Sequence, residues 1–311
     1  MAPRVSVIVP VFNDPAGIAL TLSSLLEQTD DDFEVLVVDN NSTDDTRAVV
    51  REFAARDSRI QLHVEADIQS SYAARNRGIR HATGELLAFV DADVTVEPDW
   101  LEAVVARMAD DVSYLACAVE IYSPGTETFA GKYNRLTDLR VDYFVSRLDF
   151  APTCCLVVRA SLIEELGPFD DRLTSSGDLE FGNRVAAAGY PLGFAANIVA
   201  RHPARTSVRS LVKKAIRIGH GKTQLRELYP ARYGRPRRGL VNPGAYLPPT
   251  PRALRTLVAG WETLSVREKV GVFALFYLLR LAKAYGQLEA AFAAQDRRSQ
   301  GTRQPRLSGR A

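Results

Sequence analysis

The sequence predicts an α/β protein: a Rossmann-like, mostly parallel sheet flanked by helices, with a C-terminal helical extension. Through about residue 110, short runs rich in Val, Ile and Leu alternate with segments whose apolar residues recur at helical spacing. Several of these runs end in polar side chains, as strands do at the ligand-binding edge of a parallel sheet. The chain has 311 residues, 46% of them hydrophobic, which is enough for a sizeable core.

The first half of the chain alternates strands and helices at a regular rhythm. The first strand stops near Pro10, which lacks a backbone donor, and Asp14 with Pro15 then provides a cap and a first residue preset for a helix. By the same reasoning we expect strands at 5–11, 33–38, 60–64 and 86–90 and helices at 15–26, 46–55, 70–82 and 98–108. Alternation of this kind predicts parallel pairing with right-handed crossovers.

The stretch 86–93 ends in two acids. Five apolar residues, too few for a helix, predict a strand buried on both faces, and Asp91 and Asp93 follow it directly. Two carboxylates where a strand finishes in an α/β sheet suit Mg²⁺ or Mn²⁺ holding a diphosphate. The alternative is a solvated turn after a core strand.

Beyond residue 110 the alternation becomes irregular. We expect strands at 113–122, 154–159 and 192–200 and helical segments at 129–150, 161–166 and 177–188. The chain divides into a main domain at 1–222, a Pro/Gly/Arg-rich linker at 223–260, an apolar or amphipathic helix at 261–296 and a disordered basic tail at 297–311. The helix starts at a capping box, Ser265 to Glu268, and should pack on the core, form a homodimer contact or lie in a membrane interface.

Charge is divided unevenly along the chain. Residues 1–200 hold 16 Lys and Arg against 32 Asp and Glu, a net charge of −16, whereas 201–311 hold 23 against 5, a net charge of +18. The basic part indicates an anionic partner, such as a membrane surface, a lipid phosphate or a nucleic acid, or else it neutralises the acidic part. Nucleic acid is disfavoured, because the basic run has no interleaved aromatics and no zinc or helix-turn-helix pattern.

The cysteine pattern and the hydropathy indicate an intracellular protein. Three cysteines, two of them adjacent, offer neither a disulfide framework nor zinc-site spacing. No apolar run approaches the roughly 20 residues that cross a bilayer. We therefore expect a cytoplasmic protein with peripheral contact at the inner face of the cell membrane. A stretch similar to a phosphate-binding loop, 219–223, is set aside because its first glycine is missing and no strand precedes it.

Several segments carry a family pattern by their order and spacing. They are VSVIVPVFN at 5–13, VVDNNSTD at 37–44, ARNRG at 74–78, DAD at 91–93, GPFD at 167–170, GDLE at 177–180 and His202. Together they resemble family 2 glycosyltransferases of the GT-A fold, of bacterial type, over roughly residues 1–222. The resemblance implies a nucleotide-binding half at 1–110 and an acceptor half at 111–222.

The resemblance implies that a nucleoside diphosphate sugar, UDP-linked in the first instance, lies against the first half. Pro10, Val11 and Asn13 would frame the nucleotide, largely through the backbone. Asp39 would accept a hydrogen bond from the base, since a carboxylate suits the imide N–H of uracil, or would instead cap the following helix. Arg75 would lie against base or phosphate, or would be a solvated helix charge.

The same resemblance implies a divalent cation, Mn²⁺ or Mg²⁺. Asp93 would be its direct ligand, and Asp91 would touch the ribose or a metal-bound water. His202, expected just past the end of its strand, would supply a further metal ligand or be an ordinary polar loop residue. The cation would neutralise charge on the leaving diphosphate.

Asp178 matches the family's catalytic base, which would take the proton of the acceptor hydroxyl. Attack opposite the leaving group would invert the anomeric centre. The alternative role for Asp178 is an N-cap of the helix that follows. Glu180 would be a partner to the acceptor or to the loop. The family usually has Glu immediately before this Asp, and the replacement by Gly177 puts the hydrogen bonding around the base in question.

The expected activity is therefore that of a hexosyltransferase acting on a glycan or lipid-linked acceptor, as in cell envelope polysaccharide synthesis. One alternative is a non-catalytic protein that binds nucleotide sugars. Another is a haloacid-dehalogenase-like phosphatase, because Asp91 to Thr95 fits its nucleophile motif, although that motif usually follows the first strand. A nucleotidyltransferase would usually carry a basic glycine-rich loop after the first strand, and residues 11–14 are not one.

Overall fold

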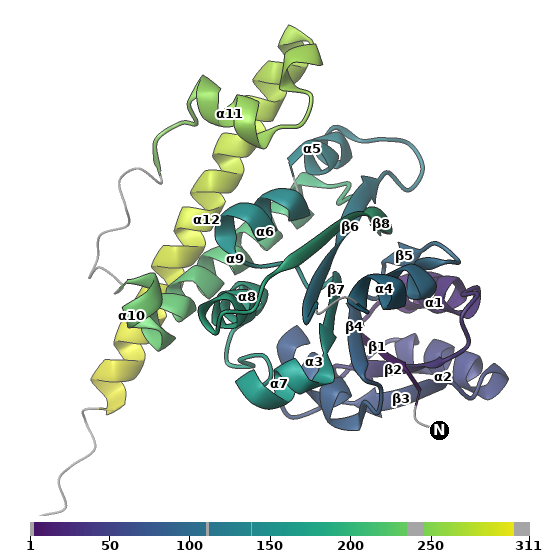
Figure 1. Ribbon diagram of the computed structural model, residues 1–311. Helices are drawn as coiled ribbons and strands as arrows, with labels where there is room; N and C mark the ends of the chain where they lie inside the picture. Colours follow the sequence, from purple (N-terminus) through teal and green to yellow (C-terminus); the bar gives the residue numbers. More distant parts are fainter. Residues whose placement is uncertain (1–2, 110–111, 138, 235–245, 302–311) are drawn as a thin grey trace, which may run out of the picture. The chain divides into compact units, whose positions relative to one another are not determined.

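A computed structural model describes residues 3–109, 112–137, 139–234 and 246–301, which form two compact units (Figure 1). The first unit ends at Thr206 and the second begins at Ser207. Part of the expected linker (235–245) and most of the expected tail (302–311) lie outside the described residues.

The first unit is built on one eight-stranded sheet with the order β3-β2-β1-β4-β7-β6-β8-β5. The strands are β1 (Val5–Val11), β2 (Phe33–Asp39), β3 (Ile60–Val64), β4 (Leu86–Val90), β5 (Thr95–Val96), β6 (Tyr114–Tyr122), β7 (Cys155–Arg159) and β8 (Gly193–Pro203). The pairs β1–β2, β1–β4 and β2–β3 are parallel, as the alternation predicts. β7 is antiparallel to both β4 and β6, so the parallel run of strands stops beside the strand that carries the acidic pair.

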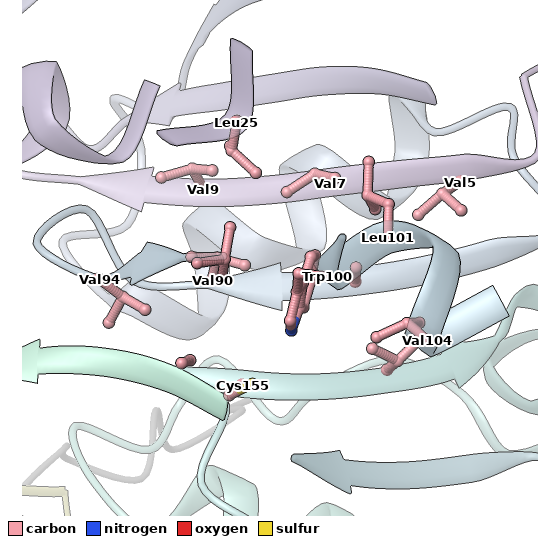
Figure 2. Close-up of a cluster of buried hydrophobic side chains, with 14 of the residues drawn as sticks. Val5, Val7, Val9, Leu25, Val90, Val94, Trp100, Leu101, Val104 and Cys155 are labelled. Atoms are coloured by element: carbon pink, nitrogen blue, oxygen red, sulfur yellow. The ribbon is translucent and has the colours of Figure 1, made fainter. Parts of the chain in front are cut away.

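Helices of the first unit cover both faces of this sheet (Figure 1). They are α1 (Pro15–Leu26), α2 (Thr46–Arg56), α3 (Ser71–His81), α4 (Trp100–Met108), α5 (Phe129–Thr137), α6 (Val141–Leu148), α7 (Ala160–Leu166) and α8 (Gly177–Ala187). On one face, apolar residues of α1, α2 and α4 pack with alternate residues of the strands; Leu25, Val7 and Trp100 in Figure 2 are examples. Burial of this continuous apolar layer is the main stabilising term of the unit.

The opposite face of the sheet carries α3 and α8. Gly78 of α3 lies so close to β1 that a Cβ there would overlap the side chain of Ile8. An aromatic series continues across this face, in which Phe169 packs against Phe89 of β4 at 5.2 Å between ring centroids and against Phe181 of α8 at 4.8 Å. α3 and α8 are thereby held over the carboxyl end of β4.

One strand differs from the prediction in a way that affects the site. β8 runs to Pro203, so His202 lies within the strand rather than past its end, where Ile121 of β6 is its partner. The short strand β5 was not predicted, because two residues carry no periodic signal. It pairs antiparallel with β8, Thr95 opposite Arg201, which fixes the chain just after the acidic pair against β8.

The second unit consists of helices. They are α9 (Val208–Leu228), α10 (Pro230–Tyr233), α11 (Pro251–Leu257), the 3-10 turn η2 (Trp261–Thr263) and α12 (Val266–Gly301). α9 and α12 approach closely at Gly219 and Gly286, where a Cβ on either glycine would overlap a backbone carbonyl of the other helix. His220 and Glu289 add an ion pair of 2.8 Å between the two helices.

The second unit begins earlier than expected. The division falls after Thr206 rather than after residue 222, because α9 packs against α12. The expected linker, 223–260, contains the end of α9 together with α10 and α11. α12 extends to Gly301, so residues 297–301 of the expected disordered tail are helical.

The start of α12 confirms the predicted capping box. The Glu268 carboxylate accepts from the Ser265 N–H at 2.8 Å, and the Ser265 hydroxyl accepts from the Glu268 N–H at 3.3 Å. Further along, α12 leaves Val270, Tyr285 and Phe292 exposed. Within the described ranges, no helix combines the length and apolar content needed to cross a bilayer.

Candidate active site

The end of β1 lies beside the end of β2. In the parallel register of the two strands, Pro10 and Val11 face the last two positions of β2, and Val11 is opposite Asp39. Asn13 follows with a φ of 50° and donates its backbone N–H to the Ser42 hydroxyl at 2.9 Å. The predicted frame of Pro10, Val11 and Asn13 is therefore fastened to the loop that follows Asp39.

Asp39 is fully buried at the end of β2. Its Oδ2 accepts from the Arg47 Nε–H at 2.6 Å and from the Ser42 N–H at 3.0 Å, while its Oδ1 has no partner among the described residues. A buried carboxylate oxygen without a donor costs about 1–3 kcal/mol, so a donor from a ligand would be strongly favoured there. Asp39 does not cap the next helix, because α2 begins only after Asp45.

Arg75 of α3 is buried and holds the first acid of the pair. Its Nη2–H donates to Asp91 Oδ1 at 2.5 Å, and the Asp91 side chain keeps about a third of its surface exposed. The Nε–H of Arg75 is buried without a partner in the described structure. Arg75 is thus not a solvated helix charge, and it has a donor to spare for a ligand.

Asp93, in the turn between β4 and β5, and His202 of β8 face each other, because β5 pairs with β8. His202 Nδ1 lies 2.8 Å from the Pro203 carbonyl, so this nitrogen is the donor, and Nε2 lies 3.8 Å from Asp93 Oδ1. Burial raises the pKa of Asp93, and Asp91 and Asp14 act in the same direction, whereas His202 opposes them.

These residues fit a sparsely coordinated divalent cation. In the part of the chain that the structure describes, no three His, Cys, Asp or Glu side chains gather as a closed metal cage. Mg²⁺ and similar cations are often held by only one or two protein oxygens together with water and substrate phosphates. Asp93 and, when the ring is neutral, Nε2 of His202 would form such a donor set, and a cation would relieve the repulsion among the three nearby carboxylates. Asp91, predicted as a further contact, forms an ion pair with Arg75 through one of its two carboxylate oxygens.

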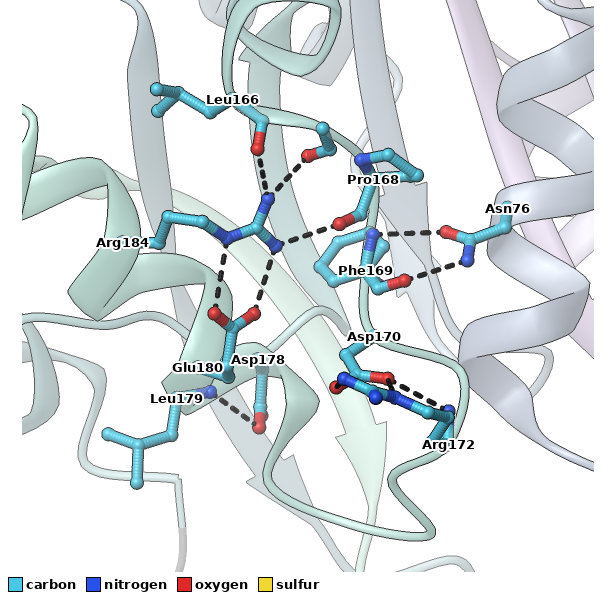
Figure 3. Close-up of polar contacts among 11 residues, drawn as sticks. Asn76, Leu166, Pro168, Phe169, Asp170, Arg172, Asp178, Leu179, Glu180 and Arg184 are labelled. Carbon is cyan, nitrogen blue, oxygen red and sulfur yellow. Dashed lines mark hydrogen bonds and ion pairs between the residues drawn. The ribbon is translucent and has the colours of Figure 1, made fainter. Parts of the chain in front are cut away.

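Asp178 is the second residue of α8 and is half-buried. Its Oδ1 accepts from the Leu179 N–H at 2.9 Å and from the Tyr72 hydroxyl at 3.4 Å (Figure 3 shows the first of these). Burial raises the pKa of Asp178, while the charge of Arg75 lowers it and that of Asp91 raises it. Asp178 therefore lies in the electrostatic field of the Arg75–Asp91 pair, which places it in the same site.

The Glu180 side chain points away from Asp178 and toward Arg184 (Figure 3). It is buried, and its two oxygens accept from Nε–H and Nη2–H of Arg184 at 3.1 and 2.9 Å (Figure 3). Arg184 also donates to the carbonyls of Leu166, Gly167 and Pro168. Of the two predicted roles for Glu180, this geometry favours the partner to the loop over the partner to the acceptor.

Some residues of the site have no signal in the sequence. Arg47, eight residues after Asp39, forms an ion pair with it. Arg184 donates hydrogen bonds to three backbone carbonyls of one turn. Both sets of contacts are created only by the fold. Asn76 was noted in the ARNRG segment, and its side-chain amide bonds both the N–H and the carbonyl of Phe169. Paired bonds of this kind fix α3 to the segment that leads into α8.

Comparisons with known proteins identify the family and the fold of this chain. The chain is 37% identical over 226 residues to Glycosyltransferase AglE of Haloferax volcanii, covering 72% of this chain and 74% of that protein. The structure resembles Mannosyltransferase PcManGT from Pyrobaculum calidifontis in complex with GDP-Man and Mn²⁺, with a TM-score of 0.58, 22% identity, and coverage of 100% of this chain and 77% of that one. It also resembles S. aureus TarS 1–349 in complex with UDP-GlcNAc, with a TM-score of 0.54, 19% identity, and coverage of 94% and 92%. At these identities the structural likeness shows the GT-A fold. The family model "Glycosyl transferase family 2" matches residues 6–167, and the chain belongs to that family of glycosyltransferases.

Proposed function

We propose that this protein is a metal-dependent, inverting hexosyltransferase. It would move a sugar from a nucleoside diphosphate sugar, UDP-linked in the first instance, to a hydroxyl group of a glycan or lipid-linked acceptor. The solved structures that it resembles hold GDP-Man with Mn²⁺ and UDP-GlcNAc, which supports a nucleotide-sugar donor and a divalent cation.

The observation that carries this proposal is the proximity of a base to an acidic pair. Arg75 forms an ion pair with Asp91, and both of their charges act on Asp178. An inverting transfer needs a proton acceptor on one side of the anomeric carbon and charge neutralisation on the other. The site supplies carboxylates for both tasks within one cluster.

The chain's own residues would divide the work as follows. The unpaired Asp39 Oδ1 accepts the N–H of the base, and the spare Nε–H of Arg75 donates to the nucleotide. Asp93 and His202 would hold the cation, which supplies charge neutralisation for the departing diphosphate. Asp178 takes the proton of the acceptor hydroxyl. At the same time the acceptor oxygen bonds to the anomeric carbon, and the bond from that carbon to the diphosphate oxygen breaks.

The test is a panel of UDP-glucose, UDP-galactose, UDP-GlcNAc and GDP-mannose, each with Mn²⁺. Thermal stabilisation measures binding, and release of UDP or GDP measures hydrolysis, with water as the acceptor. At least one donor should give both signals in the wild-type protein, and EDTA should remove both. Stabilisation without any release, also in the presence of glycan and lipid-linked acceptors, would favour the non-catalytic binding protein and contradict the proposal.

We further propose that the second unit binds to the anionic lipid surface on the inner face of the cell membrane. Residues 207–311 carry 21 basic against 5 acidic side chains. On α12 the exposed apolar residues include Val270, Leu278, Tyr285 and Phe292. Exposed apolar side chains on a helix with surrounding positive charge are typical of interfacial helices. A homodimer through the same helix stays an alternative prediction.

A further inference from the structure

The space above Gly177 is filled by an aromatic ring from another element. A Cβ built on Gly177 would lie 2.8 Å from two ring atoms of Tyr72, closer than side chains pack. Tyr72 is the second residue of α3 and is only 6% exposed. The side chain that the family pattern usually carries before the base could not be accommodated here together with this ring.

The Tyr72 ring is held from several sides. Its backbone N–H donates to the Ser70 hydroxyl, which caps α3. Phe169 lies at 6.0 Å between ring centroids, and the guanidinium carbon of Arg75 lies 5.8 Å from the ring centroid. The ring therefore has one defined position between the Arg75–Asp91 pair and the start of α8.

The Tyr72 hydroxyl lies at the N-terminal turn of α8. It donates to Asp178 Oδ1 at 3.4 Å. Hydrogen bonds from the backbone N–H groups of Gly177 and Asp178 to the Tyr72 oxygen lower its pKa. Burial strongly raises the pKa of Tyr72 and the charge of Asp178 raises it further, so the hydroxyl keeps its proton and serves as a donor to the carboxylate.

We propose that Tyr72 is the positioning residue for Asp178, and that Gly177 is required because its missing side chain leaves room for the Tyr72 ring. The role as a positioning residue of a catalytic base rests on the function proposed above. A hydroxyl that donates to Asp178 stabilises its ionised form and fixes its orientation toward the acceptor. The contacts that a glutamate before the base would make are thus replaced by contacts from α3.

The groups that face Asp178 determine the pKa that a titration of its carboxyl group would measure. They are Tyr72 and Arg75 from α3, Asp91 after β4, Tyr114 from β6 and the Leu179 N–H of its own helix. Among these, Tyr72 is the hydroxyl that reaches the carboxylate within hydrogen-bond distance. Its removal should therefore affect the pKa of Asp178 without changing any charge.

The first experiment needs no substrate. The full-length protein is labelled with ¹³C at aspartate carboxyl groups, and the Asp178 signal is identified by its loss in Asp178→Asn. In Tyr72→Phe the pKa of Asp178 should rise by about 0.5–1 pH unit, because the ionised form loses a donor. The matched control is Tyr190→Phe, since Tyr190 donates to the Glu165 carboxylate outside the site and its loss should leave Asp178 unchanged. An unchanged Asp178 pKa in folded Tyr72→Phe would overturn the proposal.

The second experiment tests the space above Gly177. With the donor of the panel that the wild-type protein hydrolyses, Gly177→Glu should lower kcat by about 10-fold or more, because the ring and the base are displaced. Adding Tyr72→Ala to Gly177→Glu should restore at least part of this loss, since the side chain then enters the vacated space. In the control, Gly182→Ala meets Phe150 at 2.6 Å, and Tyr72→Ala should not relieve it. Absence of rescue in the folded double variant would count against the proposal.

The two levels of inference fail differently. If the wild-type protein releases no nucleotide from any donor of the panel, with or without glycan and lipid-linked acceptors, the proposed function fails, while the titration still measures the effect of Tyr72 on Asp178. If the wild-type protein is active and Asp178→Asn is inactive, but Tyr72→Phe keeps both the Asp178 pKa and the wild-type kcat, only the role of Tyr72 is wrong.

Discussion

Replacing Arg184 by alanine should destabilise the first unit strongly, because Arg184 neutralises a buried acid. The Glu180 side chain is only 2% exposed and both of its oxygens are bound by the guanidinium. The same guanidinium is a donor to three carbonyls at 166–168. Removing one partner of a buried ion pair typically costs about 3–5 kcal/mol, since the other charge is left without compensation.

The magnitude translates into a clear thermal shift. A unit of about 200 residues loses roughly 2–4 °C in Tm for each kcal/mol, so Arg184→Ala should lower Tm by about 6–20 °C. Scanning calorimetry or urea unfolding measures this directly. The control is Arg140→Ala, which removes an exposed ion pair with Asp142 and should cost at most about 1 kcal/mol.

A second variant separates charge from packing. Glu180→Gln removes the buried charge, so the double variant with Arg184→Ala should be more stable than Arg184→Ala alone, by about 1 kcal/mol or more. A loss below about 1 kcal/mol for Arg184→Ala, or a double variant less stable than the single one, would refute the view that Arg184 stabilises a buried carboxylate.

Four further variants test the site and the second unit. Asp93→Ala should lose the Mn²⁺-dependent part of thermal stabilisation by a nucleotide sugar, a loss of about 2.7 kcal/mol at a donor concentration 100 times the Kd; retention of that part would contradict a metal-ligand role. Asp178→Asn should keep donor binding and lower transfer at least about 100-fold, and in the wild-type protein kcat/KM should fall as the pH drops through the raised pKa of Asp178, because the base must be ionised. Asp39→Ala should weaken donor binding about 10-fold, measured by calorimetric titration, with its partner Arg47 intact. The full chain should co-sediment with phosphatidylglycerol vesicles and not with phosphatidylcholine vesicles, and Val270→Ser with Phe292→Ser should weaken this binding; equal recovery from both vesicle types would contradict an anionic-surface role.

The sequence predicts the strands and helices of residues 1–110 well because their signals are local. The strands before Asp39 and Asp91 are continuous apolar runs, and their polar ends follow directly, so pattern and spacing alone locate them. The order of the sheet beyond β4 has no such signal, because the antiparallel pairing of β7 depends on contacts distant in sequence. For the same reason the extension of β8 through His202 could not be predicted, since its partner is β6.

The side-chain pairs at the site are even harder to predict from sequence patterns. Asp39, Arg75 and Asp178 are site candidates through the family resemblance, yet two of their partners, Arg47 and Tyr72, are brought to them by the fold. In the sequence, Gly177 stands where the family usually has a glutamate, so the position indicates only the loss of an acid. In the structure it is a contact with a ring more than 100 positions earlier in the chain, and one sequence carries no record of such a pairing.

The position of β7 bears on how enzymes of this design diversify. β7 joins β4 to β6 through main-chain ladders, and such ladders do not depend on which side chains the strands carry. Side chains of β6 and β7 can therefore change while the ends of β1, β2 and β4 keep their shape. A scaffold of this kind tolerates substitutions in these two strands without distorting the edge where β1, β2 and β4 end.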